Sequence, residues 1–283
     1  MVNNFIISNE KKFSELKEKF ILSGFSNLCI ISDFDRTMTK CFVGGKMVSS
    51  LISILRSENM LVSGYSEKAQ ALFKKYHAIE VDDSLSIGEK IPFMETWWGE
   101  HGQLLVDSGL NRKDLEKIST SPDIVFRKNC LESLSLLNLN SVPFIVLSAS
   151  GAGDESVISC LKSRDMYLDN VLVISNKYLW DDFGNAVERV KPYIHTFNKS
   201  GVSIIERKPV YSKIIGRKNF ILIGDSLGDC HMAEGLDYDN ILKIGFLNSD
   251  VENKLESYKL YYDVVITNDC EFNFVYNFLK ELN

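Results

Sequence analysis

Closely spaced cysteines are absent from this sequence. Its six cysteines are scattered over 283 residues, and no two are spaced as C-x-x-C. That distribution excludes a zinc knuckle and a compact disulfide framework, and it fits a reducing compartment, so we expect a cytoplasmic protein. Proline is also scarce, at five residues. Because no proline-rich, glycine-rich or repetitive segment divides the chain, domain boundaries have to come from the pattern of helices and strands.

Long apolar runs and an excess of positive charge are missing as well. Nowhere do about 18 apolar residues follow one another, and residues 1–12 lack a basic stretch followed by an apolar one, so we expect neither a membrane span nor a signal peptide. The formal net charge of −6 offers no general attraction to nucleic acid or anionic lipid. We therefore expect a small-molecule partner, no nucleic acid, no membrane and a monomeric protein.

Five short apolar runs have the length and composition of strands buried on both faces. They are residues 28–31, 144–147, 171–174, 220–223 and 264–266. Helical patterns at 154–162 and 229–235 lie between the later runs, and an amphipathic helix is expected over residues 9–23. Strands that alternate with helices predict an α/β fold, here with a Rossmann-like parallel sheet.

An unusually long segment separates the first two apolar runs. It exceeds one hundred residues, and its periodicity predicts helices at 66–77, 87–105, 111–118 and 127–137. We expect residues 40–125 to form an inserted helical cap, and residues 1–39 and 126–283 to form the α/β core. The cap is rich in large apolar side chains, which suits either a small core of its own or a surface that closes over a planar ligand. These are Phe93, Met94, Trp97 and Trp98.

Acidic residues follow two of the predicted strands. Asp33 and Asp35 come after the first strand, and Asp225 and Asp229 come after the fourth. The carboxyl ends of parallel strands face a common crevice, so these side chains are expected to meet there. One carboxylate can act as a nucleophile and another as a proton carrier, and a hard cation such as Mg²⁺ would let an anionic phosphate approach them. An ordinary polar loop is the alternative for Asp33 and Asp35 alone.

Residue type predicts two kinds of phosphate contact. Ser148 and the amides after it follow the second strand, and Lys199 is a candidate cation to balance the charge on phosphate oxygens. A plain turn and a solvated lysine are the ordinary alternatives. Residues 151–156 lack the third glycine of a dinucleotide-binding loop, and the motifs H-E-x-x-H, G-x-S-x-G and G-x-x-x-x-G-K-[ST] do not occur. Nicotinamide enzymes, zinc proteases, serine esterases and P-loop enzymes are therefore disfavoured.

Residues 33–39 (DFDRTMT) resemble the first signature of the haloacid dehalogenase-like phosphatases. Other segments resemble cytosolic 5′-nucleotidase III, the pyrimidine 5′-nucleotidase family, and the resemblance spans nearly the whole chain. The most specific part is the segment around Glu80, which other haloacid dehalogenase-like phosphatases do not share. The matching segments are 75–82 (KYHAIEVD), 92–94 (PFM) followed by Trp97 and Trp98, 195–199 (HTFNK), 223–229 (IGDSLGD) and 241–248 (ILKIGFLN).

This resemblance implies an enzyme that hydrolyses nucleoside 5′-monophosphates with Mg²⁺. Asp33 would attack the phosphorus to form an aspartyl phosphate, and Asp35 would protonate the departing nucleoside oxygen and then activate water. By the same resemblance, Asp33, Asp35 through its main chain, and Asp225 would bind Mg²⁺. The phosphate contacts would be Ser148, the Ala149 amide and Lys199, and Glu80 would contact the nucleoside. Asp229 either orients waters of the metal or is an ordinary first residue of a helix.

The sequence departs from the family pattern at three places. Residues 148–154 (SASGAGD) carry one residue more than the family's pattern, so either Ser148 or Ser150 is the phosphate serine, and Ser148 is favoured because it adjoins the strand. His101 stands where pyrimidine-specific members usually have serine, and Trp98 where they usually have tyrosine. Tryptophan here resembles the subgroup that prefers 7-methylguanosine monophosphate, whose cationic base gains from a large aromatic face. The ordinary alternatives are that Trp98 packs the cap and that His101 lies on the surface.

Two other functions remain open on the sequence. One is a phosphatase or phosphotransferase that acts on another small phosphate ester, from which only the Glu80 segment separates the nucleotidase hypothesis. The other is a catalytically silent nucleotide-binding protein, against which the intact carboxylates Asp33, Asp35 and Asp225 argue. The leading hypothesis is hydrolysis of UMP, CMP or 7-methyl-GMP to nucleoside and phosphate.

Overall fold

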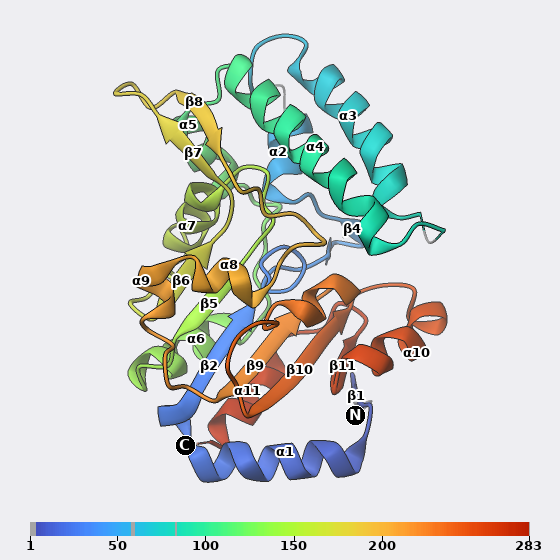
Figure 1. Ribbon diagram of the computed structural model, residues 1–283, viewed down its shortest axis with the longest axis vertical. Coiled ribbons are helices and arrows are strands. Elements are labelled where there is room, and N and C mark those ends of the chain that lie inside the picture. Colours follow the sequence, from blue (N-terminus) through green and yellow to red (C-terminus); the bar gives the residue numbers. More distant parts are fainter. Residues whose placement is uncertain (1–3, 58–59, 83, 283) are drawn as a thin grey trace.

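A seven-stranded sheet forms the centre of the molecule. The computed structural model describes residues 4–57, 60–82 and 84–282, and Figure 1 shows the sheet in its lower half. The strand order is β1-β11-β10-β9-β2-β5-β6, with all neighbours parallel except β1, which is antiparallel to β11. The α/β fold with a parallel sheet is confirmed. The strands are β1 Phe5–Ile7, β2 Leu28–Ser32, β5 Phe144–Leu147, β6 Val171–Ile174, β9 Asn219–Gly224, β10 Asn240–Leu247 and β11 Val264–Thr267.

All five predicted strands are present, and two strands of the sheet were not predicted. β10 was missed because Asn240 and Lys243 interrupt its apolar run, although this strand lies between β9 and β11. β1 is three residues long, too short to give a periodic signal. β1 closes one edge of the sheet in the antiparallel sense, which a pattern of parallel β-α-β units does not anticipate.

Helices cover both faces of the sheet, each with its own apolar cluster. On one face, Ile30 and Val146 pack with α1 Glu10–Ser23, α6 Cys130–Leu139, α7 Asp154–Lys162 and α11 Asn273–Lys280. On the other face, Ile31 and Leu147 pack with α8 Gly201–Ile205 and α10 Val251–Tyr261, and the short α9 Lys208–Tyr211 lies beside α8. Because neighbouring residues of each strand enter opposite clusters, the strands had to read as unbroken apolar runs.

The helix predicted over residues 229–235 is wrong. The chain forms the short 3₁₀ helix η2 Leu227–His231, which begins at a capping box between Ser226 and Asp229. Gly235 then takes a positive φ of 88°, and the chain turns toward β10. The helices predicted at 9–23 and 154–162 correspond to α1 and α7. The one predicted at 127–137 begins later, at Cys130, because Asn129 takes a left-handed conformation in front of it.

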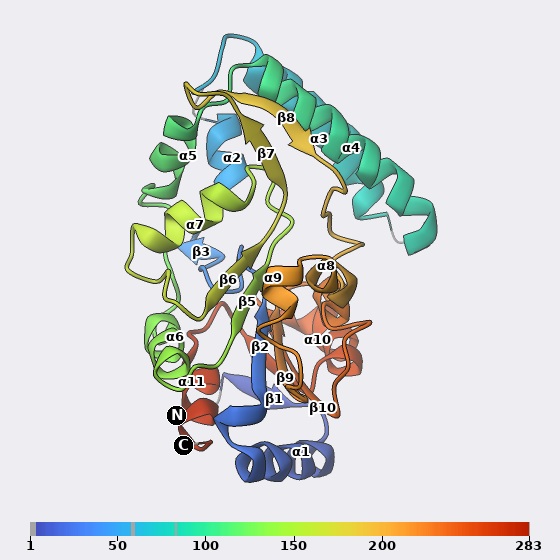
Figure 2. The same cartoon turned by 60° about the vertical axis from the view of Figure 1, so that its left-hand side comes forward.

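The segment between β2 and β5 folds as helices, as its periodicity predicted. It contains a two-stranded ribbon, β3 Phe42–Val43 and β4 Lys46–Met47, and the helices α2 Leu51–Ser57, α3 Tyr65–Glu80, α4 Ile87–Asp107 and α5 Arg112–Ser119. Figures 1 and 2 show α3 and α4 side by side in the upper half, above the sheet. This placement brings cap residues close to the acidic strand ends.

A β-hairpin packs against these helices from a distant part of the sequence. It consists of β7 Lys177–Trp180 and β8 Ala186–Val190, and β8 lies along α4 (Figure 2). Arg189 of β8 occupies the space above Gly102 of α4, where a Cβ atom would collide with the Arg189 side chain. The sequence interpretation had assigned no role to this hairpin.

Candidate active site

Asp33 lies directly after β2, and its carboxylate is buried at the carboxyl edge of the sheet. Its main-chain amide donates to the Ile223 carbonyl of β9 at 2.9 Å, which continues the pairing of the two strands past the end of β2. The carboxylate accepts a hydrogen bond from Lys199 Nζ at 2.6 Å and another from Thr37 Oγ1 at 3.2 Å. Burial raises the pKa of Asp33, and the Lys199 ammonium opposes that rise. Both carboxylate oxygens are therefore held in place by side chains.

Lys199 joins two of the strand-end acids. Its Nζ lies 2.6 Å from Asp33 Oδ1 and 2.5 Å from Asp229 Oδ1, and all three side chains are buried. Burial alone would lower the pKa of Lys199, but Asp229 and Asp33 together raise it above the ordinary value, so the ammonium stays charged. The alternative of a solvated lysine is wrong.

Asp225 completes a cluster of three carboxylates. Asp33, Asp225 and Asp229 each offer an oxygen within 4.8 Å of the others. Burial first, and then the charges of Asp33 and Asp229, raise the pKa of Asp225 well above its ordinary value. When all three are ionised, Lys199 balances one of three negative charges, which leaves two. A hard divalent cation with oxygen ligands fits this donor set.

Asp229 has a larger part in this cluster than the sequence interpretation gave it. Its Oδ2 accepts hydrogen bonds from the amides of Asp225 and Ser226 and from the Ser226 hydroxyl, while its Oδ1 faces Lys199. It is the third residue of η2 and so lies at the N-terminal end of a helix, as the ordinary alternative held, and it also fixes the loop that carries Asp225. Its spacing of four residues from Asp225 was the available signal.

Asp35 is half-buried two residues after the proposed nucleophile. The main-chain amide of Leu51, the first residue of α2, donates a hydrogen bond to the Asp35 carboxylate. Burial raises the pKa of Asp35 to about 7, and the nearby charge of Asp33 contributes to the rise. A carboxyl group with this pKa exchanges a proton near neutral pH, as a general acid and base must.

The loop after β5 lies beside Asp33. Ser32 of β2 pairs with Val146 of β5, so Ser148 follows the sheet at the same edge. Ser148 Oγ accepts a hydrogen bond from the Ser150 amide at 3.2 Å, whereas Ser150 Oγ is buried without a hydrogen-bond partner. The two serines thus have different roles in the loop, and the choice of Ser148 as the phosphate serine stays a prediction.

Two cap residues reach the core. Glu80, at the end of α3, accepts hydrogen bonds from Thr196 Oγ1 at 2.7 Å and from His77 Nδ1 at 2.9 Å. Trp98 of α4 donates from Nε1 to the Ala149 carbonyl at 3.3 Å. The sequence therefore selected cap residues that lie over the strand ends. Thr196 was missed, because nothing in the sequence indicates that its side chain meets Glu80. His77 was missed although it lies three residues before Glu80 on α3, a spacing that brings two side chains together on a helix.

His101 and Trp97 are the other cap residues for which the sequence left alternatives open. His101 is buried, 9% exposed, and its Nε2 lies 3.2 Å from Tyr65 Oη, so the alternative of a surface histidine is wrong. Burial, Arg189 and Arg56 lower the pKa of His101 to about 3. Trp97 stacks against Tyr76 with ring centroids 5.9 Å apart and packs within the cap. The contact of His101 with a nucleotide stays a prediction.

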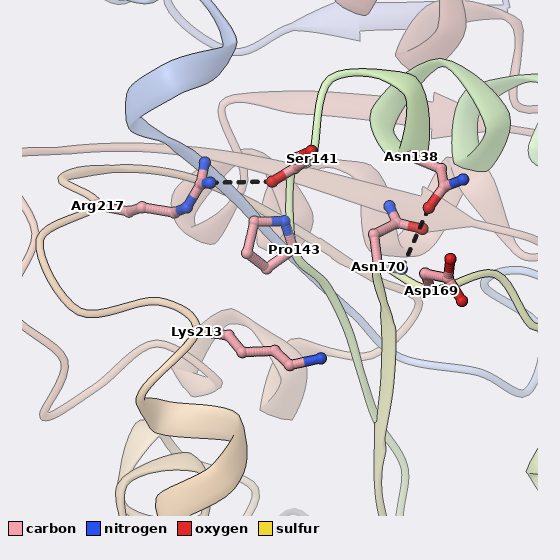
Figure 3. A pocket seen from close by; sticks show the side chains of 7 residues that line it. All are labelled: Asn138, Ser141, Pro143, Asp169, Asn170, Lys213 and Arg217. Atoms are coloured by element: carbon pink, nitrogen blue, oxygen red, sulfur yellow. Dashed lines mark hydrogen bonds between the residues drawn. The ribbon is translucent and has the colours of Figure 1, made fainter.

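Asp33 is not among the residues that line two hollows in the surface. One, of about 710 Å³, lies outside α4 and is bounded by Gly99, Tyr193 and Asn198 among others. The other, of about 400 Å³, contains Asn170, Lys213 and Arg217 and adjoins the start of β5 (Figure 3). Arg217 donates to the Phe25, Leu28 and Ser141 carbonyls, so its charge ties loops together at the edge opposite the catalytic strand ends.

The chain is similar to known nucleotidases over nearly its whole length. Residues 36–283 match the model of a family described as "Pyrimidine 5'-nucleotidase (UMPH-1)". A Gallus gallus protein named 7-methylguanosine phosphate-specific 5'-nucleotidase is 33% identical over 260 residues, which cover 91% of this chain and 88% of the relative. A Caenorhabditis elegans protein named putative cytosolic 5'-nucleotidase 3 is 31% identical, over 94% of this chain and 72% of the relative.

Solved structures agree with this similarity. The crystal structure of cytosolic 5'-nucleotidase IIIB bound to cytidine superposes with a TM-score of 0.91 at 29% identity, covering 99% of this chain and 94% of the other. A substrate-bound phosphoserine phosphatase complex gives a TM-score of 0.53 at 17% identity over 89% and 97% of the two chains, which indicates a shared fold. In the described part of the chain, no helix combines the length and apolar character that a membrane span requires.

Proposed function

Because the chain belongs to the pyrimidine 5′-nucleotidase family, we propose that it hydrolyses nucleoside 5′-monophosphates through an aspartyl phosphate on Asp33. The observation that carries this proposal is the buried Asp33 carboxylate, held by Lys199 and Thr37 beside Asp225 and Asp229. A carboxylate fixed in this way is oriented for attack on phosphorus, and in its ionised form it needs no further activation by a base.

Asp35 supplies the proton in this mechanism. Its pKa of about 7 keeps a large fraction of the carboxyl group protonated at neutral pH, so it can protonate the nucleoside oxygen as the bond to phosphorus breaks. After the nucleoside leaves, the ionised Asp35 takes a proton from the water that attacks the aspartyl phosphate. The Leu51 amide orients the carboxylate in both steps.

Lys199 and the loop at residues 148–151 balance and hold the phosphate oxygens. Mg²⁺, bound by Asp33, the main chain of Asp35 and Asp225, would supply positive charge that offsets the repulsion between the phosphate and these carboxylates. The Ser148 hydroxyl and the Ala149 amide are the proposed contacts in the loop. Asp229 holds Lys199 and the Asp225 loop in position.

The nucleoside half would lie under the cap. We assign residues 40–125 to the cap and residues 1–39 and 126–283 to the core, and the β7–β8 hairpin packs with the cap helices although it belongs to the later segment. Glu80, Trp98 and His101 are the proposed nucleoside-side residues. The relatives' names include 7-methylguanosine phosphate, and Trp98 offers the aromatic face that suits a cationic base. UMP and CMP are the other proposed substrates.

The name of one relative supports a proposal for the cellular setting. One of them is named cytosolic, and five of the six cysteines are buried and all six are free, as expected for a protein that needs no disulfide. We propose a cytoplasmic monomer that acts on small nucleotides and has neither a nucleic-acid nor a membrane partner.

A panel of phosphate esters tests this function. Release of inorganic phosphate is measured with Mg²⁺ for UMP, CMP, 7-methyl-GMP, AMP, a sugar phosphate and phosphoserine. We expect release from at least one of the first three, and near-complete loss in Asp33→Asn with nucleotide binding retained. Activity confined to the sugar phosphate and phosphoserine would disprove the nucleotidase assignment. Nucleotide binding without release, unchanged by Asp33→Asn, would indicate a silent binding protein.

A further inference from the structure

Three residues next to Trp98 carry buried polar atoms that have no hydrogen-bond partner. These atoms are Ser150 Oγ, Arg189 Nε and Nη2, and His195 Nε2. Trp98 Nε1 donates to the carbonyl of Ala149, which precedes Ser150. The Trp98 carbonyl accepts from Arg189 Nη1 at 2.8 Å, and the centroids of the Trp98 and His195 rings are 6.0 Å apart. Buried polar groups in folded proteins are nearly always paired. Unpaired atoms on three residues around Trp98 therefore indicate a missing partner near that residue.

His195 gives the clearest case, because its hydrogen-bonding state follows from its neighbours. Its side chain is fully buried, and its Nδ1 accepts a hydrogen bond from the Phe197 amide at 3.2 Å. Burial lowers the pKa of His195 to about 4, so the ring is neutral at physiological pH. A neutral imidazole whose Nδ1 accepts must carry its proton on Nε2. The unpaired atom is thus an N–H donor that requires an acceptor.

Two of the residues that follow His195 contact residues of the proposed substrate site. Thr196 donates to Glu80 of the cap, and Lys199 donates to Asp33. His195 itself adjoins Trp98. The segment 195–199 therefore passes from the aromatic face proposed for the base to the nucleophile. The Nε2–H group lies at the base end of this segment.

Arg189 indicates the charge of the missing partner. Its guanidinium is buried, and two of its nitrogens have no partner, while the third donates to the Trp98 carbonyl. The guanidinium also lies over the aromatic rings of Tyr178 and Tyr193, neither of which supplies a carboxylate. The surroundings of Trp98 thus present donors and positive charge, which favour a ligand with acceptor atoms over one with donors.

We propose that His195 is a substrate-binding residue that donates its Nε2–H to a ring carbonyl of the base, next to the Trp98 face. This inference rests on the proposed nucleotidase function and names the class of base that the site prefers. Uracil, cytosine and guanine derivatives carry a ring carbonyl, and adenine carries none. A site that hydrogen-bonds a substrate group discriminates strongly against an analogue without it, because the protein group is left unpaired. The site therefore selects oxo-bearing bases over adenine.

Two variants separate this role from a structural one. His195→Asn keeps an acceptor for the Phe197 amide but is too short to place a donor where Nε2 lies. His195→Gln is long enough to place an amide donor where Nε2 lies, but it loses the acceptor for the Phe197 amide. We expect kcat/KM for UMP to fall about tenfold in His195→Asn, the equivalent of about 1.4 kcal/mol, and to stay within about threefold in His195→Gln. AMP and ribose 5-phosphate, which lack a ring carbonyl, should change by less than about twofold in both.

Binding of the phosphate-free nucleosides uridine and 7-methylguanosine, followed by calorimetry, gives a readout independent of turnover. We expect the Kd of both to rise in His195→Asn by the same factor as kcat/KM falls. Equal losses for UMP and ribose 5-phosphate, a larger loss in His195→Gln than in His195→Asn, or nucleoside binding unchanged in His195→Asn would each overturn the role of His195. Absence of phosphate release from every nucleotide by the unaltered enzyme would instead overturn the proposed function.

Discussion

Single residues at the strand ends set the charge of the site. Three carboxylates and one ammonium share a buried space, and breaking such a group by removing one partner costs roughly 3–5 kcal/mol when it leaves a charge unpaired. Lys199 pairs with Asp33 and Asp229, whereas no described cation forms an ion pair with Asp225, whose pKa is raised by burial and by the two neighbouring carboxylates. This surplus of carboxylates favours a divalent cation at the site.

The pKa of Asp35 predicts a pH dependence that differs between substrates. Asp35 donates its proton only when protonated, and a pKa of about 7 means that the protonated fraction falls about tenfold per pH unit above that value. We expect kcat/KM for UMP to fall above pH ~7. For p-nitrophenyl phosphate, whose leaving group needs no proton, kcat/KM should stay level over the same range. Parallel pH profiles for the two substrates would contradict the role of Asp35.

At the residue scale, the sequence predicted the side chains that the chemistry requires but missed the residues that hydrogen-bond to Glu80. Asp33, Asp225 and Lys199 were predicted, the first two because strand ends meet at one edge of a parallel sheet. Thr196 was not, because its contact with Glu80 depends on how the cap sits on the core. His77 was not, although it lies one turn before Glu80 on α3, because the predicted helix ended at residue 77 and left Glu80 outside it. Contacts between segments 116 residues apart leave no local pattern.

Among the elements, α4 connects the cap to the β7–β8 hairpin and to the loop after β5. One part of it faces the hairpin through Gly102 and Arg189, and Trp98 reaches the loop after β5. The hairpin escaped the sequence interpretation, although residues 181–185 (DDFGN) carry turn residues and the Asp181 side chain accepts from the Asn185 amide. Its strands alternate exposed and buried residues in a segment where unbroken apolar runs were the signal for the sheet.

Two alanine substitutions in α4 test how closely the hairpin packs. A Cβ atom on Gly102 would collide with the buried Arg189 side chain, so Gly102→Ala should destabilise the protein by roughly 1–3 kcal/mol and lower its Tm. Gly88 lies in the same helix with open space around it, so Gly88→Ala should be neutral or stabilising by up to about 1 kcal/mol. Thermal unfolding of both variants measures the difference. Equal effects of the two would mean that α4 and β8 are not in close contact.

Across the whole molecule, the site lies where the cap and the core meet. Glu80 contacts Thr196 and Trp98 contacts Ala149, so both cap residues bond to core loops at the carboxyl edge of the sheet. The α/β class and the helical insertion could be predicted from the sequence, because buried parallel strands and amphipathic helices have distinct periods. The closed contact between cap and core could not.

Cation binding should be visible in the stability of the whole protein. A cation that binds the folded state alone at about 100 times its Kd adds about 2.7 kcal/mol, which for a chain of this size raises Tm by roughly 5 °C. We expect Mg²⁺ to give such a shift in the unaltered protein. In Asp225→Asn, the Tm without Mg²⁺ should be higher, since a carboxyl group with a raised pKa is destabilising when ionised, and the Mg²⁺ shift should disappear.

Asp237→Asn serves as the matched control for that measurement. Asp237 is exposed and pairs with Lys218 away from the carboxylate cluster, so this variant should keep the full Mg²⁺ shift. A Mg²⁺ shift that survives in Asp225→Asn, or one lost equally in both variants, would contradict a cation site at Asp225.

Detection of the phosphorylated enzyme tests the central claim most directly. In Asp35→Asn, p-nitrophenyl phosphate can still phosphorylate Asp33 because its leaving group needs no acid, but water is no longer activated to release the phosphate, so the aspartyl phosphate should accumulate. The protein is quenched in acid, digested and analysed by mass spectrometry. The account predicts one phosphoryl group on the peptide that contains Asp33, and none in the double variant Asp33→Asn, Asp35→Asn. A phosphoryl group on another residue, or p-nitrophenol release with no phosphorylated peptide, would contradict it.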